Sequence, residues 1–398
     1  MTMAAVIAND ATRTVARSAR TSVASIQIFS SFSAVEQVWR ALEAPGEIAT
    51  PYQHFDLLCA WQGNVGARLR AAPAPVIAYD SEKRPVMVLP MIIGSQGPFR
   101  IARAPGGKHT NFNMALWRRD FATSATLEDA RKIVSLIGEA DPTLDVLALS
   151  QQPLEWNGTQ NPLALLPHQP SVNECPLLTI DPKAPAGSYM GGSFRRKLNG
   201  KERKLQALPG YRYIIARNAT DATRLLDAFF AIKPLHMAAQ KIPNVFAEPS
   251  TEQFIRQACI DGLEEGKPAI ELHGLECDAE VIAIFAGVGD GQRFSTMFNT
   301  YTMSEAARNS PGLVLIRNMI DHYTRDGYTS FDFGVGTDEY KLQYCKDERQ
   351  PLIDSFVALS AKGRIAAPLL SLKSSIKRAV KHSPRAMKLF YPIRHRFG

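Results

Sequence analysis

The first part of the chain carries apolar periodicities that alternate between helix and strand. Apolar side chains recur at helical spacing in residues 35–42, and two apolar runs at 76–79 and 86–89 flank a turn-prone segment, as in a hairpin. A helical pattern at 127–137 leads into a strand pattern at 144–149. This order predicts an α/β region.

The next part of the chain repeats this kind of alternation. The pattern predicts an amphipathic helix at 193–208, a strand at 211–216 and a helix at 220–232. Two further strands, 281–288 and 293–301, are joined by an Asp-Gly pair, which is a strong turn signal. We therefore expect a second α/β region with a mixed central sheet flanked by helices.

Residues 308–344 predict a loop, a helix, a strand and the start of another helix. Pro311 suits the first turn of a helix, where no intrahelical N–H bond is lost, and Gly327 suits its end. A strand rich in aromatic residues follows at 328–333, and Thr337 with Asp338 is expected to open the next helix.

The first turn after Pro311 predicts an anion site. We expect the N–H groups of Gly312, Leu313 and Val314 to have no partner inside the helix, and Gly312 to let the backbone approach a ligand closely. Such a turn is suited to a pyrophosphate.

These patterns predict four segments. Residues 1–25 are expected to form a disordered leader, because they are rich in Ala, Ser and Thr. Two α/β domains follow at 26–170 and 171–361, with a linker rich in Pro, Asn and Gly at 153–170. Residues 362–398 form a tail of different character.

The composition is that of a globular protein without export signals. Of the 398 residues, 45% are hydrophobic and 21% are charged, and the apolar runs are too short to span a bilayer. The five cysteines have no paired spacing, which favours a reducing compartment and argues against a structural zinc site. We therefore expect a cytoplasmic protein that holds no metal.

The net charge of +8 comes from the end of the chain. Ten Lys and Arg and no acid follow residue 361, which leaves residues 1–361 with a net charge of −2. A near-neutral body disfavours a nucleic-acid enzyme. The tail predicts a basic amphipathic helix on an anionic membrane surface, and the alternative is a solvated tail.

Three motifs carry a resemblance to a known family. They are Ser310-Pro311-Gly312, Phe331-Asp332-Phe333 and Asp338-Glu339-Tyr340-Lys341. With them, the chain resembles the acetyltransferase domain of the GNAT superfamily, in the CelD-like branch named for cellulose biosynthesis proteins. The resemblance extends upstream through Leu235-His236 to residues 193–198. It implies two tandem GNAT-like domains, similar to the arrangement in Fem-type transferases.

The resemblance implies acyl transfer from acetyl-CoA or another acyl-CoA to an amine. His236 or Asp332 is expected as the general base, and Tyr340 as the group that protonates the departing thiolate. The coenzyme is expected to lie along the strand 293–301 and on the helix start; its expected contacts are Asn299, Tyr301, Ser310, Gly312, Leu313 and Val314. Phosphate or acceptor groups are expected to meet Arg195, Arg196, Asp338 and Lys341.

The acceptor implied by the family is an amino-sugar precursor of envelope or extracellular polysaccharide, either a small molecule or linked to a lipid. This places the protein in the cytoplasm, with a peripheral position on the membrane through residues 362–398. Two alternatives stay open: a Fem-like aminoacyl transferase that uses aminoacyl-tRNA, and a non-catalytic scaffold of a membrane polysaccharide assembly. The single glycine of the helix start, Gly312, keeps the scaffold open, because the superfamily loop carries more glycines.

Overall fold

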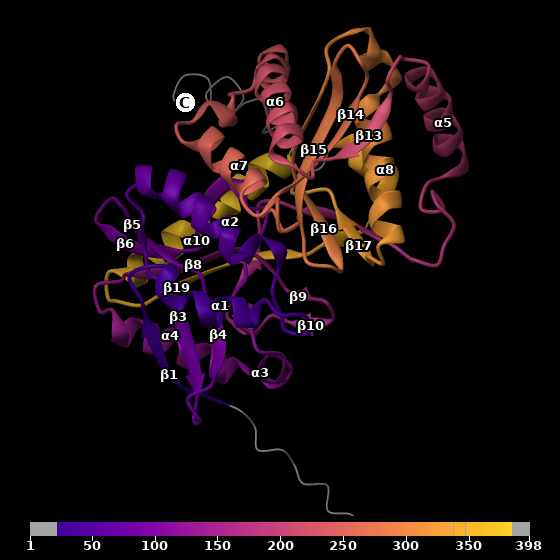
Figure 1. Cartoon of the computed structure of the whole chain (residues 1–398). Helices are drawn as coiled ribbons and strands as arrows, with labels where there is room; N and C mark the ends of the chain where they lie inside the picture. Colours follow the sequence, from indigo (N-terminus) through magenta and orange to yellow (C-terminus); the bar gives the residue numbers. More distant parts are fainter. Residues whose placement is uncertain (1–21, 337, 347, 384–398) are drawn as a thin grey trace, which may run out of the picture.

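The structure, a computed structural model, describes residues 22–336, 338–346 and 348–383 (Figure 1). Most of the expected leader, the end of the tail after residue 383 and Thr337 lie outside the described residues. The described part opens with β1 (Val23–Ile28), which pairs with β3 (Val76–Asp80). The last residues of the expected leader, 23–25, therefore belong to a strand, and Val23 is wholly buried there.

The first half of the chain forms two sheets with helices around them, in the lower left of Figure 1. The predicted hairpin is confirmed, since β3 pairs with β4 (Pro85–Leu89). The remaining strands are β2 (Ala72–Pro73), β5 (Ile92–Gln96), β6 (Phe99–Arg103), β7 (Leu116–Trp117) and β8 (Val146–Pro153). The helices are α1 (Glu36–Leu42), α2 (Phe55–Trp61), α3 (Arg119–Ser124) and α4 (Leu127–Ala140).

The expected linker is a packed part of the fold. It contains β9 (Glu155–Trp156) and β10 (Thr159–Gln160), and Trp156 is wholly buried. Its Asn and Gly residues serve a tight turn, because Asn157 and Gly158 both have positive φ. Residues 153–170 thus have the composition of a loop, but they do not form a flexible linker between the two halves.

The second half forms one mixed sheet with the order β13-β14-β15-β16-β17-β12-β18, in the upper right of Figure 1. Its strands are β12 (Cys175–Thr179), β13 (Arg212–Ile215), β14 (Glu271–Glu276), β15 (Val281–Gly289), β16 (Arg293–Tyr301), β17 (Ser330–Asp332) and β18 (Arg349–Gln350). Its helices are α5 (Gly192–Gln206), α6 (Ala219–Ala239), α7 (Thr251–Ile260), α8 (Pro311–Arg325) and α9 (Glu339–Cys345).

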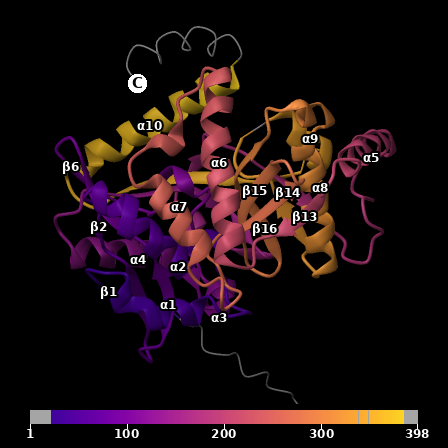
Figure 2. The same cartoon turned by 45° about the horizontal axis from the view of Figure 1, so that its top comes forward.

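The end of the described chain returns to the first half. There β19 (Leu352–Ala358) pairs antiparallel with β8 and with the short β11 (Gln169–Pro170). The helix α10 (Gly363–His382) then packs on β19 and β8, beside the first half in Figure 2. Residues 352–361 were expected in the second domain, yet they complete the sheet of the first. Local patterns specify a strand but not the sheet that it joins, so the sequence did not indicate this pairing.

The two halves share one βαβ arrangement. In the first, β6 and β8 are parallel, and the connection between them passes through β7 and α3 and ends in α4. In the second, β16 and β17 are parallel and α8 connects them. An antiparallel strand lies on either side of each parallel pair, β5 and β19 in the first sheet and β15 and β12 in the second. The predicted fold class, a mixed α/β fold with tandem halves, is confirmed.

The close approach of α10 to the first half gives a stability prediction. A side chain at Gly363 would overlap the carbonyl oxygen of Asp145, whereas one at Gly138 in α4 would lie 3.7 Å from Leu359 in ordinary contact. We expect Gly363→Ala to lower the free energy of unfolding by about 1–3 kcal/mol, because the backbone must shift. Gly138→Ala serves as the matched control and should be neutral or stabilising by up to about 1 kcal/mol. Chemical denaturation measures both, and equal stability of the two variants would contradict this packing.

Candidate functional site

The strands β16 and β17 run side by side only briefly. Their parallel pairing joins residues 293–295 to residues 330–332, while β16 continues to Tyr301. On its other side, β16 pairs with β15 and carries a bulge opposite Ala286 and Gly287. Beyond Ser295, one edge of β16 therefore has no neighbouring strand among the described residues, which leaves an opening in the sheet where its N–H groups can meet a ligand.

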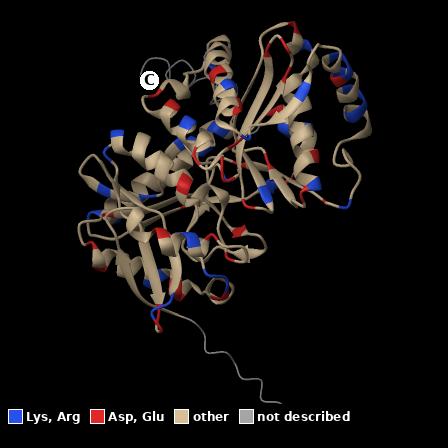
Figure 3. Cartoon of the chain, in the orientation of Figure 1, with Lys and Arg blue, Asp and Glu red and all other residues tan. Residues whose placement is uncertain are grey.

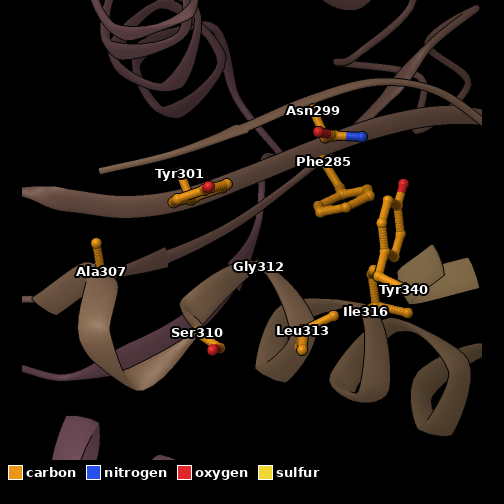
Figure 4. Close-up of a pocket in the computed structure, with 9 residues that line it drawn as sticks. All are labelled: Phe285, Asn299, Tyr301, Ala307, Ser310, Gly312, Leu313, Ile316 and Tyr340. Carbon is orange, nitrogen blue, oxygen red and sulfur yellow. The ribbon is translucent and has the colours of Figure 1, made fainter. Parts of the chain in front are cut away.

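A pocket of about 280 Å³ lies at this opening, between the free edge of β16 and the start of α8 (Figure 4). Its walls are mostly apolar or aromatic, with the polar side chains of Asn299 and Ser310 among them. The lining residues are Phe285, Asn299, Tyr301, Ala307, Ser310, Gly312, Leu313, Ile316 and Tyr340. Five of the six residues expected to bind the coenzyme thus line one cavity, and Tyr340 lies with them.

The start of α8 offers fewer free amides than expected. The N–H groups of Leu313 and Val314 donate to the carbonyl oxygen of Ser310, at 3.0 and 3.2 Å. Val314 is wholly buried and does not line the pocket, so its expected contact with a ligand is corrected. Pro311 has no N–H group, which leaves the amide of Gly312 ahead of the first helical bonds.

Lys201 adds a cation at the start of α8. Ser310 has the left-handed φ of 49° and its hydroxyl makes no capping bond to the helix. Instead, the ammonium group of Lys201 on α5 donates to this hydroxyl. The expected cations of α5, Arg195 and Arg196, are exposed and do not line the pocket. The sequence places Lys201 among the basic residues of this helix that are expected to meet phosphate groups, but no pattern indicated its contact with Ser310, which lies more than a hundred positions away.

The corresponding helix of the first half is closed to anions. The hydroxyl of Thr126 accepts from the amide of Asp129, and the Asp129 carboxylate accepts from the amide of Thr126 at 2.9 Å. This capping box occupies two amides at the start of α4, and Glu128 and Asp129 add negative charge there, which repels an anion. Of the two equivalent helices, α8 is therefore the one whose start can receive a phosphate.

Tyr340 lines the pocket from the helix α9. Its ring lies next to the ring of Phe285, and its hydroxyl points toward Asn299 (Figure 4). Burial raises the pKa of Tyr340, and a hydrogen bond with the Asn299 side chain opposes part of that rise. The hydroxyl therefore stays protonated at neutral pH.

His236 lies beside the pocket, on the helix α6. Its Nε2 is 2.8 Å from the carbonyl oxygen of Tyr301, and the two rings are in edge contact with centroids 4.4 Å apart. One turn earlier, Lys233 donates to the carbonyl oxygen of Asn299 at 2.8 Å, and burial lowers the pKa of Lys233. Because a carbonyl oxygen only accepts, Nε2 of His236 carries the proton and Nδ1 is left as the basic atom.

Asp332 is not brought together with these groups. It is wholly buried and does not line the pocket; it accepts hydrogen bonds from the Ser295 hydroxyl and from the Gly334 amide, the latter at 3.0 Å. Burial raises the pKa of Asp332 from 3.8 to about 6, against the attraction of Arg293. These bonds tie β17 to β16 where the two strands separate.

Lys341 and Asp338 hold the loop that follows β17. The ammonium group of Lys341 donates to the carbonyl oxygen of Val335 at 3.1 Å and lies 3.3 Å from the Asp338 carboxylate. Lys341 is buried, whereas Asp338 is exposed. The pair therefore positions the backbone before α9, and Lys341 has no free donor directed outward.

The first half of the chain reaches the same region. The carbonyl oxygen of Thr296, just after the paired part of β16, accepts from the hydroxyl of Tyr52 at 3.1 Å and from the side chain of Asn111 at 2.8 Å. Nearby, the guanidinium of Arg293 stacks on Trp156 at 3.9 Å. No sequence pattern indicated these contacts, because each joins residues more than a hundred positions apart.

Metal chemistry has no candidate site in this part of the fold. Within residues 22–336, 338–346 and 348–383, no group of three or more His, Cys, Asp and Glu side chains could hold a metal ion. The same residues include no helix that is long and apolar enough to cross a membrane.

Comparison with known proteins supports the assignment of the second half. Residues 192–342 match the family model of the acetyltransferase (GNAT) domain. A search of the curated proteins gives no match. The solved structure of FemX is similar over 87% of this chain and 100% of its own, with a TM-score of 0.55 at 8% identity. The C-terminal domain of a putative lysylphosphatidylglycerol synthetase from Agrobacterium fabrum matches over 87% and 96%, with a TM-score of 0.49 at 12% identity.

The GNAT part of the predicted resemblance is therefore confirmed for residues 192–342. The likeness to FemX covers both halves and concerns the fold alone. The narrower CelD-like branch stays a prediction.

The environment of Asp332 gives a prediction about pH and stability. Because the folded state raises its pKa, the protonated carboxyl stabilises the fold below about pH 4, and this contribution is lost as the pH rises through about 6. Asp332→Asn keeps a neutral side chain at every pH. Between pH 4 and 7, its free energy of unfolding should therefore rise relative to the wild type, by about 3 kcal/mol at most.

Asp80 supplies the matched control of opposite sign. It is buried too, but hydrogen bonds from Arg84 and Arg118 outweigh burial and lower its pKa. Asp80→Asn should therefore be less stable than the wild type at neutral pH, with a gap that narrows in acid. Denaturation curves between pH 4 and 7 measure the first difference, and curves continued below pH 4 measure the second, because the pKa of Asp80 lies below 3.8 in the folded state. Parallel curves for Asp332→Asn and the wild type would contradict the raised pKa.

Proposed function

We propose that this protein is an acyltransferase that moves an acyl group, acetyl first among them, from acyl-CoA to an amine acceptor. The observation that carries the proposal is the open start of α8 at a pocket beside the free edge of β16. The equivalent helix of the first half is closed by its own capping box, so the second half is the one suited to the coenzyme.

The residues of the pocket fit an acyl-CoA. Gly312 offers an amide and Ser310 a hydroxyl at the helix start, and the ammonium of Lys201 supplies positive charge for a pyrophosphate. Apolar side chains such as Phe285 and Ile316 suit a pantetheine arm. The carbonyl groups of that arm can accept from N–H groups along the free edge of β16, because side chains already bond to the carbonyl oxygens of Asn299 and Tyr301. The thioester supplies the activated acyl group, and a backbone N–H of that edge is suited to hold its carbonyl oxygen.

We assign proton transfer to Tyr340 and His236. Tyr340 stays protonated and faces the pocket, so it is suited to give its proton to the departing thiolate. His236 is suited to accept the proton of the attacking amine at Nδ1, because its Nε2 is held by Tyr301. Asp332 is assigned a positioning role, since it is buried away from the pocket.

The resemblance also indicates a class of acceptor. On the resemblance to the CelD-like branch, we infer an amino-sugar precursor of envelope or extracellular polysaccharide, either small or linked to a lipid. Such an acceptor would meet the enzyme in the cytoplasm or on the cytoplasmic face of the membrane.

A Fem-like aminoacyl transferase is the second candidate. The fold likeness to FemX favours it, and so does the exposed basic face of α5 beside the site (Figure 3). The cations of that face are Arg195, Arg196, Lys197, Arg203 and Lys204. Transfer from an aminoacyl-tRNA, with binding that weakens steeply as salt is added, would support this candidate over the first.

The proposed coenzyme site predicts the effect of filling it. A side chain at Gly312 would begin 3.6 Å from the Tyr301 ring, inside the pocket but without a clash in the fold. Gly312→Leu should therefore weaken acetyl-CoA binding at least about ten-fold by calorimetry, about 1.4 kcal/mol, at unchanged thermal stability. The control is Gly63→Leu, which changes an exposed helical glycine with open space around it. Unchanged affinity of Gly312→Leu, or no binding by the wild type, would contradict the site and favour a scaffold.

If Tyr340 is the proton donor, its removal should change the rate of turnover without changing the binding of acetyl-CoA. Tyr340→Phe should lower kcat about 100-fold while the Kd for acetyl-CoA stays the same, because only the hydroxyl is removed. Asp332→Asn should keep most of the wild-type kcat, because its carboxylate only positions the strands. Release of the CoA thiol with glucosamine as acceptor measures both rates. A large loss in Asp332→Asn with full activity in Tyr340→Phe would reverse the two assignments.

A further inference from the structure

The helix α10 has a continuous apolar stripe on its outer side. Ile365, Leu369, Leu372 and Ile376 are 64, 56, 56 and 52% exposed, respectively. Their spacing of four, three and four residues places them on one face of the helix. The side of α10 that is buried against the first half carries small residues instead, namely Gly363, Ala366, Ala367 and Ser374. The exposed side of α10 is therefore apolar, whereas the exposed side of a surface helix is usually polar.

Cations lie on both sides of this apolar stripe. At helical spacing, Lys373 and Lys377 follow one side, and Arg364 and Arg378 follow the other. All four are exposed, and within the described part of the chain none of them forms an ion pair. The segment from residue 362 to residue 383 contains no acid.

Two hollows flank α10, and three of these four cations line them. One, of about 360 Å³, is lined by Lys373 and Lys377, and the other, of about 500 Å³, is lined by Arg364. The acid that lines both, Asp354, is buried and already accepts hydrogen bonds from the amide of Gln151 and the hydroxyl of Ser374. Each hollow therefore presents positive charge to an anionic group of small size.

We propose that α10 docks the protein on a bilayer that contains anionic phospholipid. The apolar stripe enters the boundary between headgroups and acyl chains, and the flanking lysines and arginines meet the lipid phosphates. The position of α10 on the outside of the first half, in Figure 2, leaves this face free to lie along a membrane. This docking surface is independent of the acyl transfer proposed above.

The charge pattern favours a membrane over the other occupants of an apolar face. Two copies of the chain meeting through the apolar stripe would bring four cations against four cations, which opposes association. A nucleic acid would satisfy the cations but would leave the apolar stripe against phosphates. An anionic bilayer satisfies both features together.

Vesicle flotation of the full chain tests the proposal. Vesicles of phosphatidylcholine with added phosphatidylglycerol should bind the protein, and vesicles of phosphatidylcholine alone should bind it much less. Replacing all four apolar residues of the stripe by serine should lower the partition coefficient more than about 100-fold. Each lysine removed, as in Lys373→Gln or Lys377→Gln, should lower it about five-fold, with a loss that shrinks as salt is added. Leu69→Ser is the matched control, since Leu69 is 59% exposed elsewhere on the surface.

Tryptophan fluorescence gives a second readout that does not depend on a loss of binding. The four native tryptophans are buried, so brominated acyl chains should not quench them. A tryptophan introduced by Leu369→Trp should be quenched on vesicles, and one introduced by Leu69→Trp should not. Equal vesicle binding by the serine variant, an unquenched Leu369→Trp, or a dimer in solution that the serine variant abolishes would each overturn the proposal.

Discussion

The hydrogen-bonded ladder between β8 and β19 is the constraint on which the rest of this fold depends. It joins a strand of the first half to a strand that follows the whole second half, so the six-stranded sheet of the first half is incomplete until β19 joins it. The same closure presses the halves together where Tyr52 and Asn111 bond to Thr296 and where Trp156 covers Arg293. The opening beside β16 is therefore a product of both halves, although the pocket residues come from the second alone.

The two βαβ arrangements differ at the start of their helices. In the first half, Thr126 and Asp129 satisfy the start of α4 from within. In the second, Ser310 takes a left-handed conformation and its hydroxyl turns to Lys201, which leaves the start of α8 facing the pocket. A few side chains at a helix terminus thus separate a supporting half from a half equipped for chemistry, on backbones of the same design.

The sequence indicated local structure well and long-range structure poorly. The hairpin of β3 and β4, the helix after Pro311 and the residues around Gly312 followed from periodicity and turn chemistry, which act within a few positions. The partner of β19, the packing of Trp156 and the proximity of Lys201 to Ser310 depend on contacts between distant segments. Asp332 shows the same limit within the site: alternation placed it opposite Phe331 and Phe333, but could not tell that both sides of this strand are buried.

The ladder between β8 and β19 also has a consequence for biosynthesis. About 200 residues separate the paired strands, so a ribosome working at about 5–20 residues per second finishes β8 roughly 10–40 s before it delivers β19. During that interval the nascent first half has an unsatisfied sheet edge, which is a site for mispairing with neighbouring chains. The six-stranded sheet of the first half can therefore be completed only after the second half has been synthesised.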